Sequence, residues 1–79
     1  MEYILTKHAK DMMIERNIKS EWLKDVISNP DFIEERIDGN KHYFKKIIDF
    51  GNRYLHIVIN NTVEPSNVIT LFFDRNVMR

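Results

Sequence analysis

The sequence predicts an α+β fold in which two N-terminal helices pack on one face of a four-stranded antiparallel meander sheet. Apolar residues recur with helical spacing up to residue 28, and from Asp31 onward they alternate with a period of two. Short turn signals separate the alternating stretches, which favours antiparallel neighbours. The 79 residues provide for one core, so residues 1–79 are expected to form a single domain.

The first helix is expected over residues 7–16. Thr6 is a suitable N-cap residue, and Asn17 tolerates the left-handed backbone that ends many helices. The expected buried side of this helix, with i, i+3, i+4 and i+7 spacing, consists of Ala9, Met12, Met13 and the stem of Arg16.

The second helix is expected over residues 21–28, with Ser20 as its N-cap. Proline disfavours helical backbone in the residue before it, so Asn29-Pro30 should end the helix. Its apolar stripe is made of Trp22, Leu23, Val26 and Ile27.

Four strands follow in this interpretation, with Asp38-Gly39 and Gly51-Asn52 as hairpin turns. Their expected ranges are 32–37, 42–50, 53–60 and 67–73. Residues 3–5 are a further candidate for a short edge strand.

Alternation along these strands predicts which side chains face the helices. The residues expected in the core are Phe44, Ile48, Phe50, Leu55, Ile57, Ile59, Ile69, Leu71 and Phe73. The residues expected on the opposite face include Tyr43, Lys45, Ile47, Asp49, Tyr54, His56, Val58, Val68, Thr70 and Phe72. That face would then be an aromatic and basic surface.

Composition narrows the classes of function. The chain has no cysteine, which argues for a reducing compartment such as the cytoplasm and excludes thiol chemistry. No apolar run reaches the ~20 residues that cross a membrane. The 12 acidic and 12 basic residues give zero net charge, but residues 1–38 sum to −3 and residues 39–79 to +3. Only the second half is therefore suited to a polyanion such as RNA.

The interleaved aromatic and cationic side chains are typical of proteins that bind single-stranded RNA, where rings stack on bases and cations contact phosphates. The alternative is that Tyr43, Tyr54 and Phe72 only stabilise cross-strand pairs.

Three histidines, at 8, 42 and 56, are the side chains that titrate near neutral pH. RNA cleavage without a metal requires a base, an acid and cations around the phosphate. His8 or His56 together with Lys45, Arg53 or Arg75 would supply these groups. No histidine pair has the i, i+4 spacing of a helical metal site, so neither a metal nor another cofactor is predicted.

The two remaining arginine candidates each have a structural alternative. Asp74-Arg75 closes the last strand, where it is either a surface ion pair or a phosphate contact made by the arginine. Arg16 either packs along its helix or binds an anion.

Residues 5–18, LTKHAKDMMIERNI, resemble the opening of a family of small bacterial domains of unknown function with the pattern T-x-H-A-x-x-R-M-x-x-R-x-I. The stretches HYFK at 42–45, RYLHIV at 53–58 and TLFFDR at 70–75 resemble the later motifs of that family. Two features depart from the pattern: Asp11 stands where the family usually has arginine, and the net charge is zero.

This family resembles the RelE/ParE-like toxins, which implies a metal-independent endoribonuclease that forms a toxin–antitoxin pair. The resemblance implies His8, Lys45, Arg53 and Arg75 as catalytic residues. It also carries over Arg16, Tyr43 and Thr70, which are expected to bind RNA together with Tyr54 and His56 of the aromatic and basic face. RNA and a cognate antitoxin are the implied partners, and a homodimer is left open. A toxin of the BrnT type and a non-catalytic RNA- or protein-binding module are the alternatives.

Overall fold

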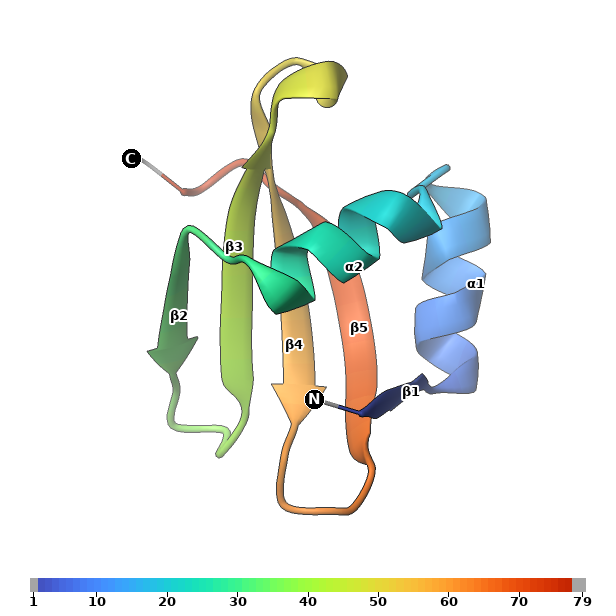
Figure 1. Cartoon of the computed structure of the whole chain (residues 1–79), viewed down its shortest axis with the longest axis vertical. Helices are drawn as coiled ribbons and strands as arrows, with labels where there is room; N and C mark the ends of the chain where they lie inside the picture. The colour runs from blue at the N-terminus through green and yellow to red at the C-terminus, as the bar shows by residue number, and fades with distance from the viewer. Residues whose placement is uncertain (1, 78–79) are drawn as a thin grey trace.

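The computed structural model describes residues 2–77, which form one sheet with two helices (Figure 1). The elements, in chain order, are β1 (Tyr3–Leu5), α1 (Lys7–Glu15), α2 (Ser20–Ser28), β2 (Phe32–Glu35), β3 (Lys41–Ile47), the 3₁₀ turn η1 (Ile48–Phe50), β4 (Arg53–Asn60) and β5 (Ser66–Asp74). The α+β class is confirmed.

The sheet has five strands in the order β1-β5-β4-β3-β2. Strands β2 to β5 form the expected antiparallel meander, but β1 adds a fifth strand that runs parallel to β5. The candidate edge strand at residues 3–5 is thus confirmed, but the prediction of a four-stranded, purely antiparallel sheet is wrong. The helices connect β1 to the meander, and this long connection allows β1 to lie parallel at the edge.

Helix α1 begins as expected. The Thr6 hydroxyl accepts a hydrogen bond from the Ala9 N–H at 3.2 Å and donates one to the Ile69 carbonyl at 3.1 Å, so the cap also fastens the helix to β5. Asn17 has φ 53° just after the helix, the predicted left-handed residue. The cap of α2 differs from the expectation, because Ser20 is its first helical residue and Lys19 occupies the N-cap position without a side-chain cap.

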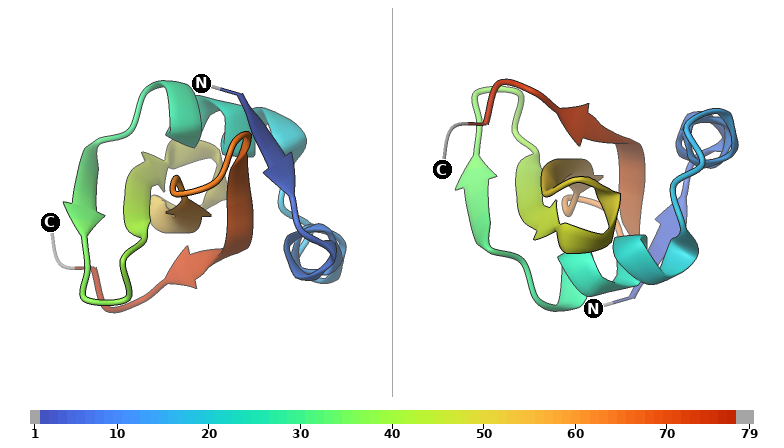
Figure 2. Two further views of the ribbon diagram at one scale, coloured as in Figure 1. Left: turned by 90° about the horizontal axis from the view of Figure 1, so that it is seen from below. Right: turned by 90° about the horizontal axis from the view of Figure 1, so that it is seen from above.

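Helix α2 lies across one face of the sheet, and α1 lies beside the edge formed by β1 and β5 (Figure 2). The Trp22 ring packs against the rings of Phe50 and Phe73, with centroids 5.5 and 6.0 Å away. The buried core on this side consists of Ala9, Ile18, Trp22, Leu23, Val26, Tyr43, Ile47, Leu55, Ile57, Ile59, Val68 and Leu71.

The faces of β3 are the reverse of those predicted. A turn made only of Gly51 and Asn52 would pair Phe50 with Arg53, but Arg53 pairs with Ile47 because η1 intervenes. This shift of three residues is odd, so every side chain of β3 changes face. Tyr43, Lys45 and Ile47 consequently lie on the helix side, while the buried Phe44 lies on the other side, opposite His56. Ile48, expected in the core, is exposed.

Strand β5 contains an irregularity that also changes a face assignment. Val58 pairs with Thr70 but Ile59 pairs with Val68, which leaves Ile69 as an extra residue. Val68 is therefore buried in the core and Ile69 is only half-buried, the opposite of the prediction. Beyond this bulge Leu71 lies in the core as predicted and Phe73 packs against it.

The side of the sheet opposite α2 is called the distal face here. It carries Phe32, Glu34, His42, Phe44, Lys46, Tyr54, His56, Val58, Thr70, Phe72 and Asp74. The C-terminal end of β5 curves across this face toward β2 (Figure 2). Asn76 and Val77 consequently lie in one hollow with Phe32 and Arg36, so part of the distal face is covered and not the open surface that was expected.

Candidate anion-binding site on the distal face

A chain of four hydrogen-bonded side chains crosses the distal face. Asp38 Oδ2 lies 2.9 Å from His42 Nε2, and His42 Nδ1 lies 2.7 Å from His56 Nε2. His56 Nδ1 lies 2.9 Å from Asp74 Oδ2, which completes the chain. It joins the turn after β2 to the end of β5, so residues 36 positions apart in the sequence share one network.

His56 is enclosed by aromatic rings. The centroids of Phe44 and Phe72 lie 4.2 and 4.7 Å from its own, and the side chain is buried. Burial lowers the pKa of His56 below its usual value of 6.5, and the hydrogen bond to Asp74 offsets only part of this effect. His56 is therefore expected to be a neutral imidazole near pH 7.

The carboxylates at the two ends of the chain are held ionised. A hydrogen bond from the Asn40 N–H lowers the pKa of Asp38, and the contact with His42 acts in the same direction. Burial raises the pKa of Asp74, but hydrogen bonds from the Asn76 N–H and from His56 outweigh it, so the pKa lies below the usual 3.8.

A hollow of about 400 Å³ opens at the end of the sheet where β4 begins and β5 ends. It is called the cationic pocket here, and its lining residues are Lys46, Asn52, Arg53, Tyr54, Phe73, Asp74, Arg75 and Val77. Three cations and one carboxylate give the lining a formal charge of +2. Two guanidinium groups and an ammonium group at one hollow are suited to phosphate or carboxylate oxygens.

The cations of this pocket are partly positioned by rings. The Lys46 ammonium lies 5.6 Å from the centre of the Tyr54 ring, and the Arg53 guanidinium lies 5.4 Å from that of Phe50. Lys46, Arg53 and Arg75 are all exposed, so a ligand has access to them.

A second hollow, of about 300 Å³, shares Asp74 and Val77 with the cationic pocket. Arg36 lies within it, 2.9 Å from Glu34 Oε1 and 5.5 Å from the centre of the Phe44 ring. The Asp74 carboxylate is thus the point where both hollows meet the hydrogen-bonded chain.

Only part of the predicted site comes together. Arg53, Tyr54 and Arg75 meet in the cationic pocket. His8 instead contacts Thr70, with 3.2 Å between its Nε2 atom and the Thr70 hydroxyl. Thr70 precedes Arg75 by five residues, roughly 16 Å along an extended strand, so His8 and the pocket occupy different parts of β5.

The other predicted residues lie elsewhere. Lys45 is on the helix side, where its ammonium donates to the Asn29 carbonyl at 3.0 Å and pairs with Asp31 at 3.7 Å. Tyr43 is buried beneath the helices, contrary to its expected place on the exposed face. His56 is on the expected face but buried, and Arg16 is exposed at the C-terminal end of α1.

The hydrogen-bonded chain of side chains was not predicted from the sequence, because His42 was assigned to no site. The available signal was Asp38, four residues before His42 across the predicted hairpin turn. The contact between His42 and His56 depends on the register of β3, which was predicted with the wrong phase. Lys46 was missed for the same reason. Among residues 2–77 no group of three or more acidic or histidine side chains is arranged to hold a metal ion.

Comparison with known proteins identifies the family of the chain. Within residues 2–77, no helix is both long and apolar enough to cross a bilayer. No curated protein and no solved structure matches the chain. One family profile matches residues 5–73. This range includes most of the sheet and three members of the hydrogen-bonded network, Asp38, His42 and His56. The protein belongs to the family described as domain of unknown function DUF4258.

Proposed function

We propose that this domain binds single-stranded RNA through the cationic pocket. The observation that carries the proposal is the convergence of Lys46, Arg53 and Arg75 on one hollow of about 400 Å³. Guanidinium groups donate paired hydrogen bonds to phosphate oxygens, and the neighbouring Tyr54 is of the residue type that contacts bases. The resemblance of the sequence to RelE/ParE-like toxins is what favours RNA over other anions.

The expected binding is local and depends on salt. The chain has zero net charge, so attraction of RNA must come from this pocket and not from the molecule as a whole. Each phosphate contact releases counterions and makes the logarithm of the binding constant fall with the logarithm of salt concentration.

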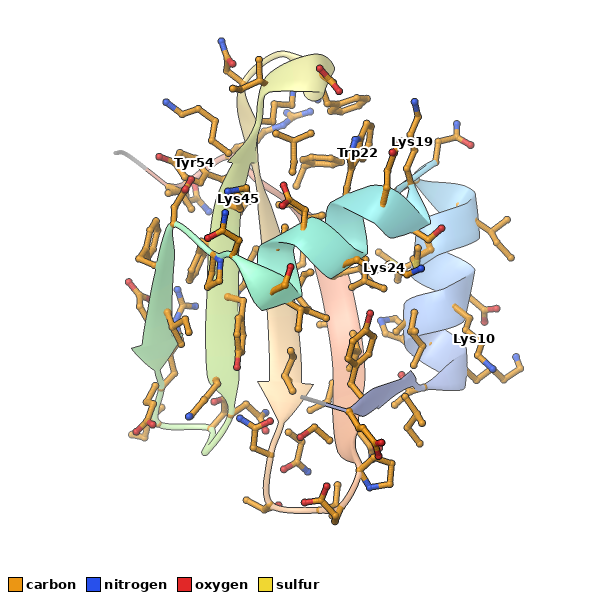
Figure 3. The ribbon with its side chains drawn as sticks, viewed as in Figure 1. Lys10, Lys19, Trp22, Lys24, Lys45 and Tyr54 are labelled. Carbon is orange, nitrogen blue, oxygen red and sulfur yellow. The ribbon has the colours of Figure 1, made fainter. Side chains whose placement is uncertain are left out.

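Fluorescence anisotropy with a labelled single-stranded RNA, measured at two salt concentrations, tests the proposal. The double variant R53A/R75A should bind at least tenfold more weakly and lose about one to two units of salt slope. The matched control is K10A/K24A, which removes two exposed cations from the helices (Figure 3) and should leave the affinity unchanged. Equal losses in both variants, or no RNA binding by the wild type at low salt, would contradict the proposal.

Metal-independent RNA cleavage is the second candidate function, and Asp74 is the observation that favours it. Its carboxylate lines the same hollow as the three cations and is hydrogen-bonded to His56. In such a reaction the 2′-hydroxyl attacks phosphorus while a carboxylate accepts its proton. The 5′-oxygen leaves with a proton from water, and a 2′,3′-cyclic phosphate and a 5′-hydroxyl are formed. Cations stabilise the charge on the phosphate in the transition state.

Cleavage is tested with the same RNA in the presence of EDTA, with the product ends identified by mass spectrometry. Growth arrest on expression, relieved by Arg75→Ala, would place the activity in a toxin–antitoxin pair of the RelE/ParE or BrnT type. In that case an acidic segment of the antitoxin is expected to occupy the cationic pocket, because it carries the same kind of oxygen atoms as RNA.

A further inference from the structure

The hydrogen-bonded chain on the distal face needs a definite number of protons. Its three contacts join two carboxylates and two imidazoles over distances of 2.7 to 2.9 Å. Ionised carboxylates only accept hydrogen bonds, and a neutral imidazole has a single N–H. Two neutral rings therefore supply two protons for three contacts. All three hydrogen bonds form only when one ring is an imidazolium.

We propose that the Asp38–His42–His56–Asp74 chain holds one exchangeable proton and thereby makes RNA binding in the cationic pocket dependent on pH. This inference rests on the proposed RNA-binding function, whose regulation it describes. Asp74 provides the link, because its carboxylate both accepts from His56 and lines the pocket. The chain is thus in direct contact with the site that it is proposed to control.

The proton is assigned to His42. Burial among Phe44 and Phe72 lowers the pKa of His56, so His56 is the neutral ring that donates to Asp74 and accepts from His42. His42 then donates from both nitrogens, to His56 and to Asp38. Asp38 is the exposed end of the chain, so loss of the proton is expected to open the Asp38 contact and leave the Asp74 contact closed.

The sign of the effect follows from the charges. With its proton, the chain carries two carboxylates and one imidazolium, a sum of −1, and without the proton it carries −2. Deprotonation therefore adds one negative charge to a network that reaches the pocket through Asp74, so RNA should bind more weakly at higher pH. Binding and protonation are reciprocal, so if bound phosphate raises the pKa of the chain by one unit, the affinity falls about tenfold as the proton is lost.

Other charged groups lie near the hydrogen-bonded network on each of the surrounding elements. On the distal face and at the ends of its strands these are Glu34 and Arg36 from β2 and its turn, Lys46 from β3, Tyr54 from β4, and Arg75 after β5, with His8 of α1 reaching Thr70. His8 is the other histidine among these groups, and histidine is the residue type whose charge can change near neutral pH. It therefore serves as the control position for the hydrogen-bonded network.

The dissociation constant for a labelled single-stranded RNA, measured from pH 6 to pH 8.5 at fixed salt, tests the proposal. We expect it to rise by about three- to tenfold for the wild type. His42→Gln should flatten this dependence, because its amide donates and accepts hydrogen bonds but does not titrate in this range. His8→Gln is the matched control and should keep the wild-type pH profile. RNA affinity that does not change with pH would overturn the coupling.

Nitrogen NMR of the imidazoles in the free protein measures the proton itself and needs neither RNA nor a variant. One imidazolium and one neutral ring among His42 and His56 at pH 6.5 is the expected result, and two neutral rings would overturn the assignment. Absence of RNA binding at every pH would overturn the proposed function together with the coupling. RNA binding that is independent of pH would overturn the coupling alone.

Discussion

His42 Nδ1 and His56 Nε2 lie 2.7 Å apart, although the two residues are not directly opposite in the sheet. His42 pairs with Val58 and His56 pairs with Phe44, so the imidazoles meet diagonally between β3 and β4. Both residues are buried, with 5% and 2% of their surface exposed. A contact of this kind between buried rings requires a proton between them. The protonation of the two rings should therefore affect both the free energy of unfolding and the binding of RNA.

The free energy of unfolding should fall as the pH falls below about 6.5. Burial lowers the pKa of His56 in the native state, whereas the unfolded state keeps the usual value of 6.5. On the acid side the unfolded state binds more protons, so stability falls as the pH falls, in agreement with the lowered pKa of His56.

Urea unfolding at pH values from 4 to 9 measures this profile. Each unit by which the pKa of His56 is lowered in the native state corresponds to about 1.4 kcal/mol of stability lost at acid pH. A second decrease is expected as the pH approaches 3.8 and below, because Asp38 and Asp74 have lowered pKa values and lose stability on protonation. Stability that does not fall between pH 7 and pH 5 in the wild type would contradict the lowered pKa of His56.

Asp74→Asn should separate RNA binding from RNA cleavage. The substitution raises the formal charge of the cationic pocket from +2 to +3, so RNA affinity should increase by about threefold. The amide oxygen still accepts from His56, so the loss of stability should be about 1 kcal/mol. If Asp74 accepts a proton during cleavage, the cleavage rate should fall by about 10²-fold or more.

Anisotropy and cleavage assays on the same preparation of Asp74→Asn decide between the two functions. Tighter binding by the variant together with loss of cleavage assigns Asp74 to catalysis. Tighter binding by the variant, with the RNA left intact by both proteins, indicates a binding module. Weaker binding by the variant would show that the carboxylate contacts RNA through a favourable hydrogen bond, contrary to the charge argument.

The sequence predicted the helices and the meander but not the phase of β3, and the reason is local. The turn Gly51-Asn52 was recognised from its residue types, and both residues have positive φ, 65° and 57°. The one-turn helix η1 before it is not signalled by composition, because Ile48, Asp49 and Phe50 continue an alternating pattern. An insertion of three residues reverses the faces, so one undetected turn caused Tyr43, Lys45 and Ile47 to be assigned to the wrong face.

The candidate site was predicted where it depends on strand ends and missed where it depends on register. Arg53 opens β4 and Arg75 follows β5, and neighbouring antiparallel strands bring such ends together whatever the phase of β3. The meeting of His42 with His56 needs the register of β3 and β4. Covering of the distal face by the curved end of β5 is a property of tertiary structure that strand alternation does not encode.

The burial of Tyr43 gives a direct test of the corrected phase. Tyr43 has 7% of its surface exposed beneath the helices, whereas Ile37 in the turn after β2 is fully exposed. Tyr43→Ala should lower the free energy of unfolding by about 3 kcal/mol, and Ile37→Ala should change it by less than about 0.5 kcal/mol. Urea unfolding monitored by Trp22 fluorescence measures both effects. Equally small effects of the two substitutions would indicate that Tyr43 lies on the exposed face, as the sequence predicted.

Lys45 and Lys46 are consecutive in β3 and therefore lie on opposite faces of the sheet, which makes them a matched pair. Lys45 binds the Asn29 carbonyl and Asp31 at the end of α2, while Lys46 lines the cationic pocket. Lys45→Ala should lower stability by up to about 1 kcal/mol and leave RNA affinity unchanged. Lys46→Ala should weaken RNA binding by about three- to tenfold and reduce the salt slope by about one unit, with little change in stability. Anisotropy and urea unfolding on the two variants measure these effects. If Lys45→Ala were instead the variant deficient in RNA binding, the RNA site would lie on the helix side of the sheet.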